Sequence, residues 1–222
     1  MRGLYQLRSA FLWLMVFAAM ALLPLLLASI GARPGRGWLI ELGVGLGLTG
    51  LGLMVVQAWT SGRQEFVARN WGADNLMHFH RHLGAFAVLM ALAHPVTLFI
   101  ADPEYLDYLD PRADWMRAGS LWVLYGALVL IALSSYFRKS LCLSYELWRL
   151  LHGALVLAIL LLGLGHALMV DHHLGELWKQ VLLLAFVGSG ISLVAYSRLI
   201  RPLLSRRRPW KVTSVKPERG NT

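Results

Sequence analysis

Six long apolar segments separated by short polar loops dominate the sequence and limit the folds that it can adopt. Each segment is close to the length of about 20 residues that an α-helix needs to cross the hydrocarbon of a bilayer. The 222-residue chain is 57% hydrophobic, with a mean hydropathy of +0.57, which is unusual for a soluble domain. No alternating strand pattern is present, so the sequence predicts an all-α membrane protein, a six-transmembrane-helix bundle. Glycines in the second span suit close helix packing. The predicted spans are residues 11–30, 38–59, 77–100, 119–137, 147–170 and 177–200.

Charged residues flank the spans unevenly and predict their orientation. With both termini in the cytoplasm, 16 of the 21 Lys and Arg residues fall on the inner side, which is the positive-inside bias. We therefore expect a multi-pass protein of the cell (inner) membrane, and the net charge of +9 needs no nucleic-acid partner. Arg2, Arg8 and the apolar run after them also resemble a signal peptide. That run is longer than a usual signal core, so we expect an uncleaved first span.

Two pairs of histidines in the third and fifth spans are the most informative residues of the sequence. His80 and His94 are separated by 14 residues, and so are His152 and His166. Fourteen residues of α-helix rise about 21 Å and return to within roughly 40° of the starting face. Both spans run from inside to outside, so His80 and His152 form an inner pair, and His94 and His166 form an outer pair. Each pair can supply both axial ligands of one haem iron, which predicts two haems stacked across the bilayer.

Alternative roles for these histidines are less favourable. These histidines could serve only in helix packing or capping. Two pairs at equal spacing argue against this alternative, because an ionisable residue within the hydrocarbon usually has a functional role. Zinc or copper would also accept imidazole, yet zinc prefers four ligands and each level offers two good ones. No Cys-x-x-Cys-His sequence is present, so we expect two noncovalent b-type haems. Small or aliphatic residues between the ligands leave room for flat macrocycles, or serve helix packing; they are Gly84, Ala87, Ala91, Ile159 and Gly163.

The remaining histidines and an acidic loop are weaker candidates. His78 and His82 flank His80 and point about 160° away from it around the helix, so we expect them to be interfacial, with contact to a haem propionate as the alternative. His172 and His173 follow the fifth span, and we expect them to be exposed loop residues, with an outer substrate site as the alternative. The loop between the third and fourth spans could attract cationic ferric complexes, although a solvated loop is favoured. Its acidic residues are Asp102, Glu104, Asp107, Asp110 and Asp114.

Two stretches around the histidines carry a resemblance to a known family. Residues 79–84 (Phe-His-Arg-His-Leu-Gly) through 93–95 (Ala-His-Pro), and 148–152 (Trp-Arg-Leu-Leu-His) through 165–166 (Gly-His), resemble the third and fifth spans of the ferric reductase and NADPH oxidase superfamily. The resemblance covers essentially the whole chain. It implies a six-helix domain in which two b-type haems are bound by the histidine pairs.

The same resemblance implies an activity. Electrons would pass from cytoplasmic NAD(P)H through FAD to the inner haem, then to the outer haem, and finally to oxygen or ferric iron outside. Arg81 and Arg149, beside the inner ligands, would contact haem propionates or the flavin domain, or serve only as positive-inside anchors. Eukaryotic NADPH oxidases have a further histidine one turn past the outer ligand of the third span. This sequence has Leu98 there, which puts dedicated superoxide production in doubt.

The C-terminal residues extend the resemblance. Residues 210–218 (Trp-Lys-Val-Thr-Ser-Val-Lys-Pro-Glu) resemble the first strand of the FAD-binding domain of this family. We expect residues 1–205 to form the haem-binding transmembrane domain, and residues 206–222 to form a basic tail and the start of a missing FAD-binding domain. The chain would then be the membrane half of an NAD(P)H oxidase or ferric reductase, with a separate reductase as the alternative.

Two further functions stay open from the sequence. One is a haem-bearing membrane subunit that passes electrons to a periplasmic reductase such as methionine sulfoxide reductase. The other is a haem-free membrane scaffold or transporter.

Overall fold

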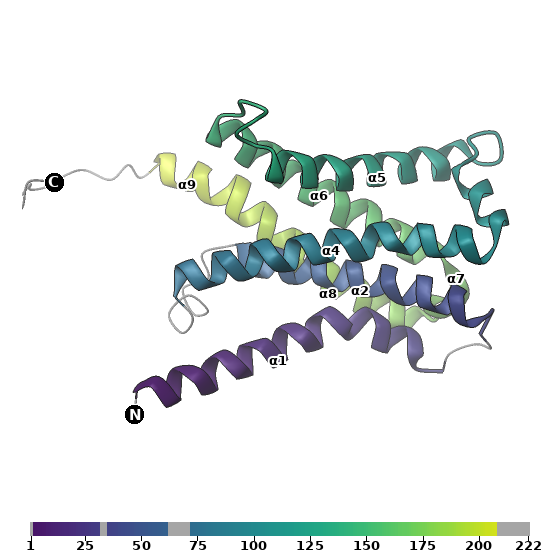
Figure 1. Ribbon diagram of the computed structural model, residues 1–222, viewed down its shortest axis with the longest axis horizontal. Helices are drawn as coiled ribbons and strands as arrows, with labels where there is room; N and C mark the ends of the chain where they lie inside the picture. Colours follow the sequence, from purple (N-terminus) through teal and green to yellow (C-terminus); the bar gives the residue numbers. More distant parts are fainter. Residues whose placement is uncertain (1, 32–34, 62–71, 208–222) are drawn as a thin grey trace, which may run out of the picture.

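The computed structural model describes residues 2–31, 35–61 and 72–207, which form helices joined by turns (Figure 1). Six of these helices are long and apolar enough to cross a membrane, and no strand occurs among the described residues. The prediction of an all-α membrane protein with six spans is therefore confirmed. The strand expected at residues 210–218 lies outside the described residues. The elements are α1 (Arg2–Ser29), α2 (Trp38–Ser61), α4 (Ala73–Ala101), the 3-10 helix η1 (Pro103–Leu109), α5 (Trp115–Tyr136), α6 (Tyr145–Met169), α7 (Asp171–Leu174), α8 (Leu177–Ala195), the π-helix η2 (Tyr196–Ile200) and α9 (Arg201–Arg207).

Several helices begin earlier than the predicted spans because a polar first turn precedes the apolar segment. Helix α5 begins at Trp115 rather than at residue 119, and the side chain of Asp114 accepts hydrogen bonds from the backbone N–H groups of Met116 and Arg117. This capping satisfies donors that have no partner within the first turn of a helix. The apolar pattern thus locates the centre of each span, whereas the capping residues set its ends.

Helix α2 is the central helix and packs against α1, α4, α6 and α8. Val55, in its second half, has no exposed surface. Glycines allow the neighbouring helices to approach closely. A Cβ atom at Gly50 would lie 3.1 Å from the backbone nitrogen of Ala91 on α4, and one at Gly52 would collide with the carbonyl oxygen of Ala21 on α1. The expected packing role of the glycines in this span is confirmed.

Helices α4 and α6 run in the same direction through the bundle. Both run from the end of the bundle where α1 begins and α9 ends toward the opposite end (Figure 1). Two residues separated by 14 positions on α4 and two residues separated by 14 positions on α6 can therefore lie at matching depths along the bundle. Large apolar side chains are exposed on the outside of the bundle, among them Leu89, Trp122 and Leu161, as expected for a surface that contacts lipid. The side of the membrane that each end faces stays a prediction.

Candidate functional site

Two pairs of histidines face each other between α4 and α6. In the inner pair, the ring centroids of His80 and His152 lie 6.5 Å apart, with 58° between the ring planes. In the outer pair, the centroids of His94 and His166 lie 6.2 Å apart, with 61° between the planes. The structure thus brings together the four histidines that the spacing singled out, two at each level. Their binding of haem stays a prediction.

The spacing within each pair fits one metal ion between two imidazoles. Two metal–nitrogen bonds of about 2 Å each, with the rings on opposite sides of the ion, place the ring centroids roughly 6 Å apart. The backbones of α4 and α6 are not in close contact, whereas α4 packs tightly against α2. A cofactor in a helix bundle is bound in this way, by side chains of facing helices that leave space between them. The residues present therefore fit two haems.

The backbone of α2 orients the outer histidine of α4. His94 Nδ1 donates a hydrogen bond of 2.8 Å to the carbonyl oxygen of Gly43. Because a carbonyl oxygen can only accept, the proton is on Nδ1, and Nε2 keeps the lone pair that a metal needs. Gly47 makes room for the ring, since a Cβ atom there would lie 2.8 Å from His94 Nδ1 and 2.9 Å from Cγ. Sequence reasoning assigned these glycines a packing role and did not reveal their contact with His94.

Two hydroxyl groups orient the inner histidines. The hydroxyl of Thr60 on α2 lies 3.2 Å from His80 Nδ1 and 3.0 Å from the carbonyl oxygen of Val56. The hydroxyl donates to that carbonyl and so can accept from the ring. The hydroxyl of Ser135 on α5 lies 3.2 Å from His152 Nδ1. Hydrogen bonds of this kind fix the tautomer and the orientation of metal-binding histidines. Neither hydroxyl was predicted from the sequence.

An apolar cavity surrounds the outer pair. Residues of α2, α4, α5 and α6 line it, together with tyrosines of η1. Small residues such as Gly47 and Gly163 form part of its wall, and Leu98 also faces it. An apolar wall of this kind limits the access of water and lowers the local dielectric around a bound redox group.

The small residues between the ligands of α4 mainly contact α2. A Cβ atom at Gly84 would lie 3.5 Å from the side chain of Gln57, and Ala91 packs on Gly50. Their role is therefore helix packing, which was the alternative considered for them. Ala91 and Ile159 also line the cavity of the outer pair.

Arg198 is a basic residue near the inner pair that sequence reasoning did not single out. It lies in η2, and its aliphatic part packs against Gly153 of α6, where a Cβ atom would lie 3.5 Å from the arginine Cγ. Its guanidinium group acts electrostatically on both His80 and His152. Short π-helical segments often occur at functional sites. From the sequence this residue could only be counted among the positive-inside charges, because the fold alone brings it to α6.

The basic residues that the sequence did single out lie at the surface. Arg81 and Arg149 are exposed, and the guanidinium carbon of Arg149 lies 6.0 Å from the centroid of the Tyr145 ring. Their predicted contacts with propionates or a flavin domain stay predictions. His78 and His82 are exposed as well, as expected for interfacial residues.

Most of the acidic side chains in the outer loop have local hydrogen-bonding roles. Asp102 accepts from the backbone N–H of Glu104, and Asp110 accepts from that of Arg112. Asp114 caps α5. Capping therefore gives these three carboxylates a structural role, and the attraction of cationic complexes by the loop stays a prediction.

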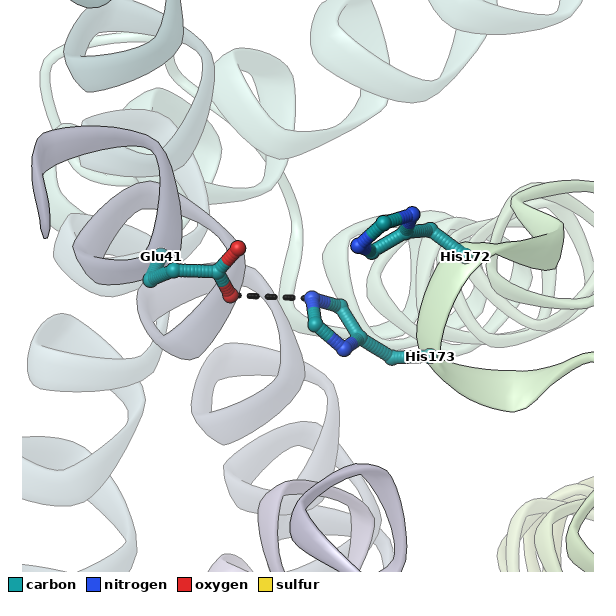
Figure 2. Close-up of side chains that lie close together, drawn as sticks. All are labelled: Glu41, His172 and His173. Carbon is teal, nitrogen blue, oxygen red and sulfur yellow. Dashed lines mark ion pairs between the residues drawn. The ribbon is translucent and has the colours of Figure 1, made fainter. Parts of the chain in front are cut away.

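The expectation that His172 and His173 are exposed loop residues is wrong. Both are partly buried in the short helix α7. The side chain of His173 is 9% exposed, and its Nε2 lies 2.9 Å from Glu41 Oε2 on α2 (Figure 2). Burial lowers the pKa of His173, while the Glu41 carboxylate acts in the opposite direction. His173 also lines the cavity of the outer pair.

A comparison with protein families gives a match over much of the bundle. The family described as "Ferric reductase like transmembrane component" matches residues 46–163, which is more than half of the chain. The matched stretch runs from α2 into α6. It contains His80, His94 and His152, and it ends three residues before His166. No curated protein and no solved structure matches the chain.

Proposed function

The chain belongs to the ferric reductase-like transmembrane family, and on this premise we propose that it transfers electrons across the cell membrane through two haems. The family implies an oxidoreductase with haem- and flavin-linked electron transfer. The proposed donor is NAD(P)H through FAD on the cytoplasmic side, in a further domain or a partner, and the proposed acceptor is oxygen or a ferric complex outside. We assign residues 1–205 to the haem-binding domain and residues 206–222 to its connection with the flavin-binding part.

The two levels of facing histidines are the observation that carries this proposal. His80 and His152 would bind the inner haem, and His94 and His166 would bind the outer one, with ring centroids 6.5 Å and 6.2 Å apart. Each haem, when bound, would supply a centre that takes up and releases one electron. The chain holds the two levels of histidines about 21 Å apart along the helices. An electron would then cross the roughly 30 Å of hydrocarbon in several shorter transfers.

Neighbouring residues prepare the histidines for this role. The Gly43 carbonyl holds the proton of His94 on Nδ1, and the hydroxyl groups of Thr60 and Ser135 can accept from Nδ1 of His80 and His152, which would leave Nε2 available for iron. Arg198 supplies a positive charge near the inner pair, where a haem propionate would be stabilised by it. The apolar residues that line the cavity around the outer pair would limit the access of water to that level.

The acceptor would be reduced without binding to iron. Because each level supplies two histidines that would both hold the iron, a bound haem would leave the acceptor no site on the metal, and electron transfer would have to occur without such a bond. Leu98 lines the outer cavity at the position where eukaryotic NADPH oxidases have a histidine. Oxygen and ferric complexes are therefore proposed as alternative acceptors, to be separated by measuring superoxide and ferrous iron in parallel.

The test is electron transfer across a proteoliposome. The reconstituted protein receives NADPH and a flavoprotein on its cytoplasmic face and a membrane-impermeant ferric chelate on the other. We expect wild type to reduce the chelate, and His166→Ala to retain a reducible inner haem but lose chelate reduction by orders of magnitude, because the remaining gap is much longer. His82→Ala is the matched control, since His82 is an exposed histidine on α4.

Several results would contradict the proposal. A pyridine haemochrome assay that finds no haem in the purified protein would exclude a path through haem. Chelate reduction by His166→Ala at the rate of His82→Ala would show that the outer level is not on the path. Reduction by NADPH in the absence of a flavoprotein would contradict the proposed donor.

A further inference from the structure

Three potential metal ligands that the proposed electron path does not use converge at the outer end of the bundle. Glu41 comes from the first turn of α2, and His172 and His173 come from α7 (Figure 2). Their ligand atoms all lie within 4.8 Å of one another. The two imidazole rings are perpendicular, with centroids 4.5 Å apart, so they present nitrogens to the carboxylate from different directions.

Glu41 is held by one carboxylate oxygen and presents the other. Oε1 accepts a hydrogen bond of 3.1 Å from the backbone N–H of Arg36, and the Arg36 Nε lies 3.8 Å away. Oε2 faces His173 Nε2 at 2.9 Å. The carboxylate is thus oriented before any ion binds, and orientation of a ligand by a second contact is a regular feature of metal sites.

The two histidine nitrogens at this place are buried. Nε2 of His172 and Nε2 of His173 are both shielded from solvent, and His172 Nε2 has no hydrogen-bond partner among the described residues. His173 Nε2 is paired with the Glu41 carboxylate at 2.9 Å. The His173 side chain is more than nine-tenths buried. Buried polar atoms without partners require an explanation, and an ion is one.

We propose that Glu41, His172 and His173 bind a divalent transition-metal ion, for which zinc is the best match. Two imidazoles and one carboxylate are ligands that zinc accepts, with the fourth position left to water. Other first-row metals with an affinity for imidazole also fit this donor set. Magnesium and calcium do not fit it, because they take oxygen ligands.

The distances are compatible with such a site. Ligand atoms around a tetrahedral zinc lie roughly 3.3 Å apart, given bonds of about 2 Å. Metal binding would lengthen the 2.9 Å distance between His173 Nε2 and Glu41 Oε2 slightly. It would shorten the longest distance between the ligand atoms, which is at most 4.8 Å. Small rotations of the three side chains achieve both changes.

An ion pair is the simplest alternative. A protonated His173 beside Glu41 would explain their contact, but it would leave His172 Nε2 buried without a partner. A metal ion satisfies both histidines and links α7 to α2. Since His173 lines the same cavity as His94 and His166, the ion would lie beside the outer pair. The site itself does not depend on the proposed electron transfer.

Calorimetric titration with zinc chloride tests this site. The full chain is purified in detergent, and any affinity tag is removed beforehand. We expect one zinc ion per chain, no binding of magnesium, and affinity reduced at least about 10-fold in Glu41→Gln, His172→Ala and His173→Ala, since even loss of an outer contact of a metal site has an effect of this size. His78→Ala, at an exposed histidine of α4, is the control and should bind like wild type.

X-ray absorption at the zinc edge provides a second measurement on the unaltered protein. Two imidazole ligands and at least one oxygen ligand would support the proposal, and haem iron does not interfere at this energy. Absence of one-to-one binding, equal binding by wild type and Glu41→Gln, or loss of binding in His78→Ala would each overturn it. These measurements involve neither haem nor electron transfer, so they are independent of the outcome of the proteoliposome experiment.

Discussion

The contact between Gly47 and His94 allows a single methyl group to be directed at the outer haem site. In Gly47→Ala the new Cβ atom would lie 2.8 Å from His94 Nδ1, 2.9 Å from Cγ and 3.1 Å from Cε1. An ordinary contact begins at 3.4 Å, so the ring must retreat by about 0.6 Å. The same ring donates a 2.8 Å hydrogen bond to Gly43. Retreat of the ring therefore strains this bond and moves the proposed ligand atom.

The size of the effect follows from these contacts. Overpacking of a well-packed interior by one methyl group destabilises by about 1–3 kcal/mol. If the strain falls on the haem-bound state, the affinity for the outer haem decreases roughly 5-fold to 140-fold, at about 1.4 kcal/mol for each factor of ten. The inner pair is about 21 Å away along the helices and should be unaffected.

The assay is the amount of haem per chain after dilution and gel filtration, measured as the pyridine haemochrome. We expect two haems in wild type and a loss toward one in Gly47→Ala. Gly45→Ala is the matched control on the same helix, because its Cβ atom would meet only Leu25, at an ordinary 3.8 Å. If Gly47→Ala kept two haems with an unchanged potential for the outer one, the proposed role of α2 in positioning His94 would be refuted.

Two further substitutions probe the inner level. Thr60→Val removes a hydroxyl that can accept from His80 Nδ1, so the ring becomes a weaker electron donor to iron and the midpoint potential of the inner haem should rise. A hydrogen bond of about 1 kcal/mol corresponds to roughly 40 mV for one electron. Ser61→Ala is the control, because among the described residues the Ser61 hydroxyl donates to the Ala58 carbonyl of its own helix. Arg198→Gln removes a positive charge that would stabilise the added electron, so the same potential should fall. Arg201→Gln, at an exposed position, is the control and should leave the potential of the inner haem unchanged. Redox titration measures this potential in all four variants.

The spans and the histidine pairs could be predicted because both depend on one helix at a time. Hydropathy over about 20 residues identifies a span, and the spacing of 14 residues fixes the relative level and face of His80 and His94 without any knowledge of the neighbours. The orientation of the spans in the membrane is also predicted locally, from loop charges, and it stays a prediction. These properties are local, so they do not depend on how the helices pack against one another.

The contacts that complete the sites could not be predicted, because each joins residues far apart in the chain. The sequence does not indicate that Gly43 and Thr60 contact histidines of α4, because a glycine or a threonine on a membrane helix usually serves packing. Arg198 reaches the inner pair only through the way α8 and η2 pack on α6. Glu41 and His173 meet because the short turn of α7 folds back over the start of α2.

These distant contacts share one element, because α2 supplies a partner to a histidine at every level of the protein. Glu41 faces His173 at the outer end, Gly43 binds His94, and Thr60 binds His80. From Glu41 to Thr60 the helix rises about 28 Å, which is nearly the thickness of the hydrocarbon. Helix α2 carries none of the proposed haem ligands, yet it determines how the ligands of α4 are oriented. Its glycines serve different requirements: Gly50 and Gly52 permit close approach of α4 and α1, whereas Gly47 leaves open space for the imidazole ring of His94.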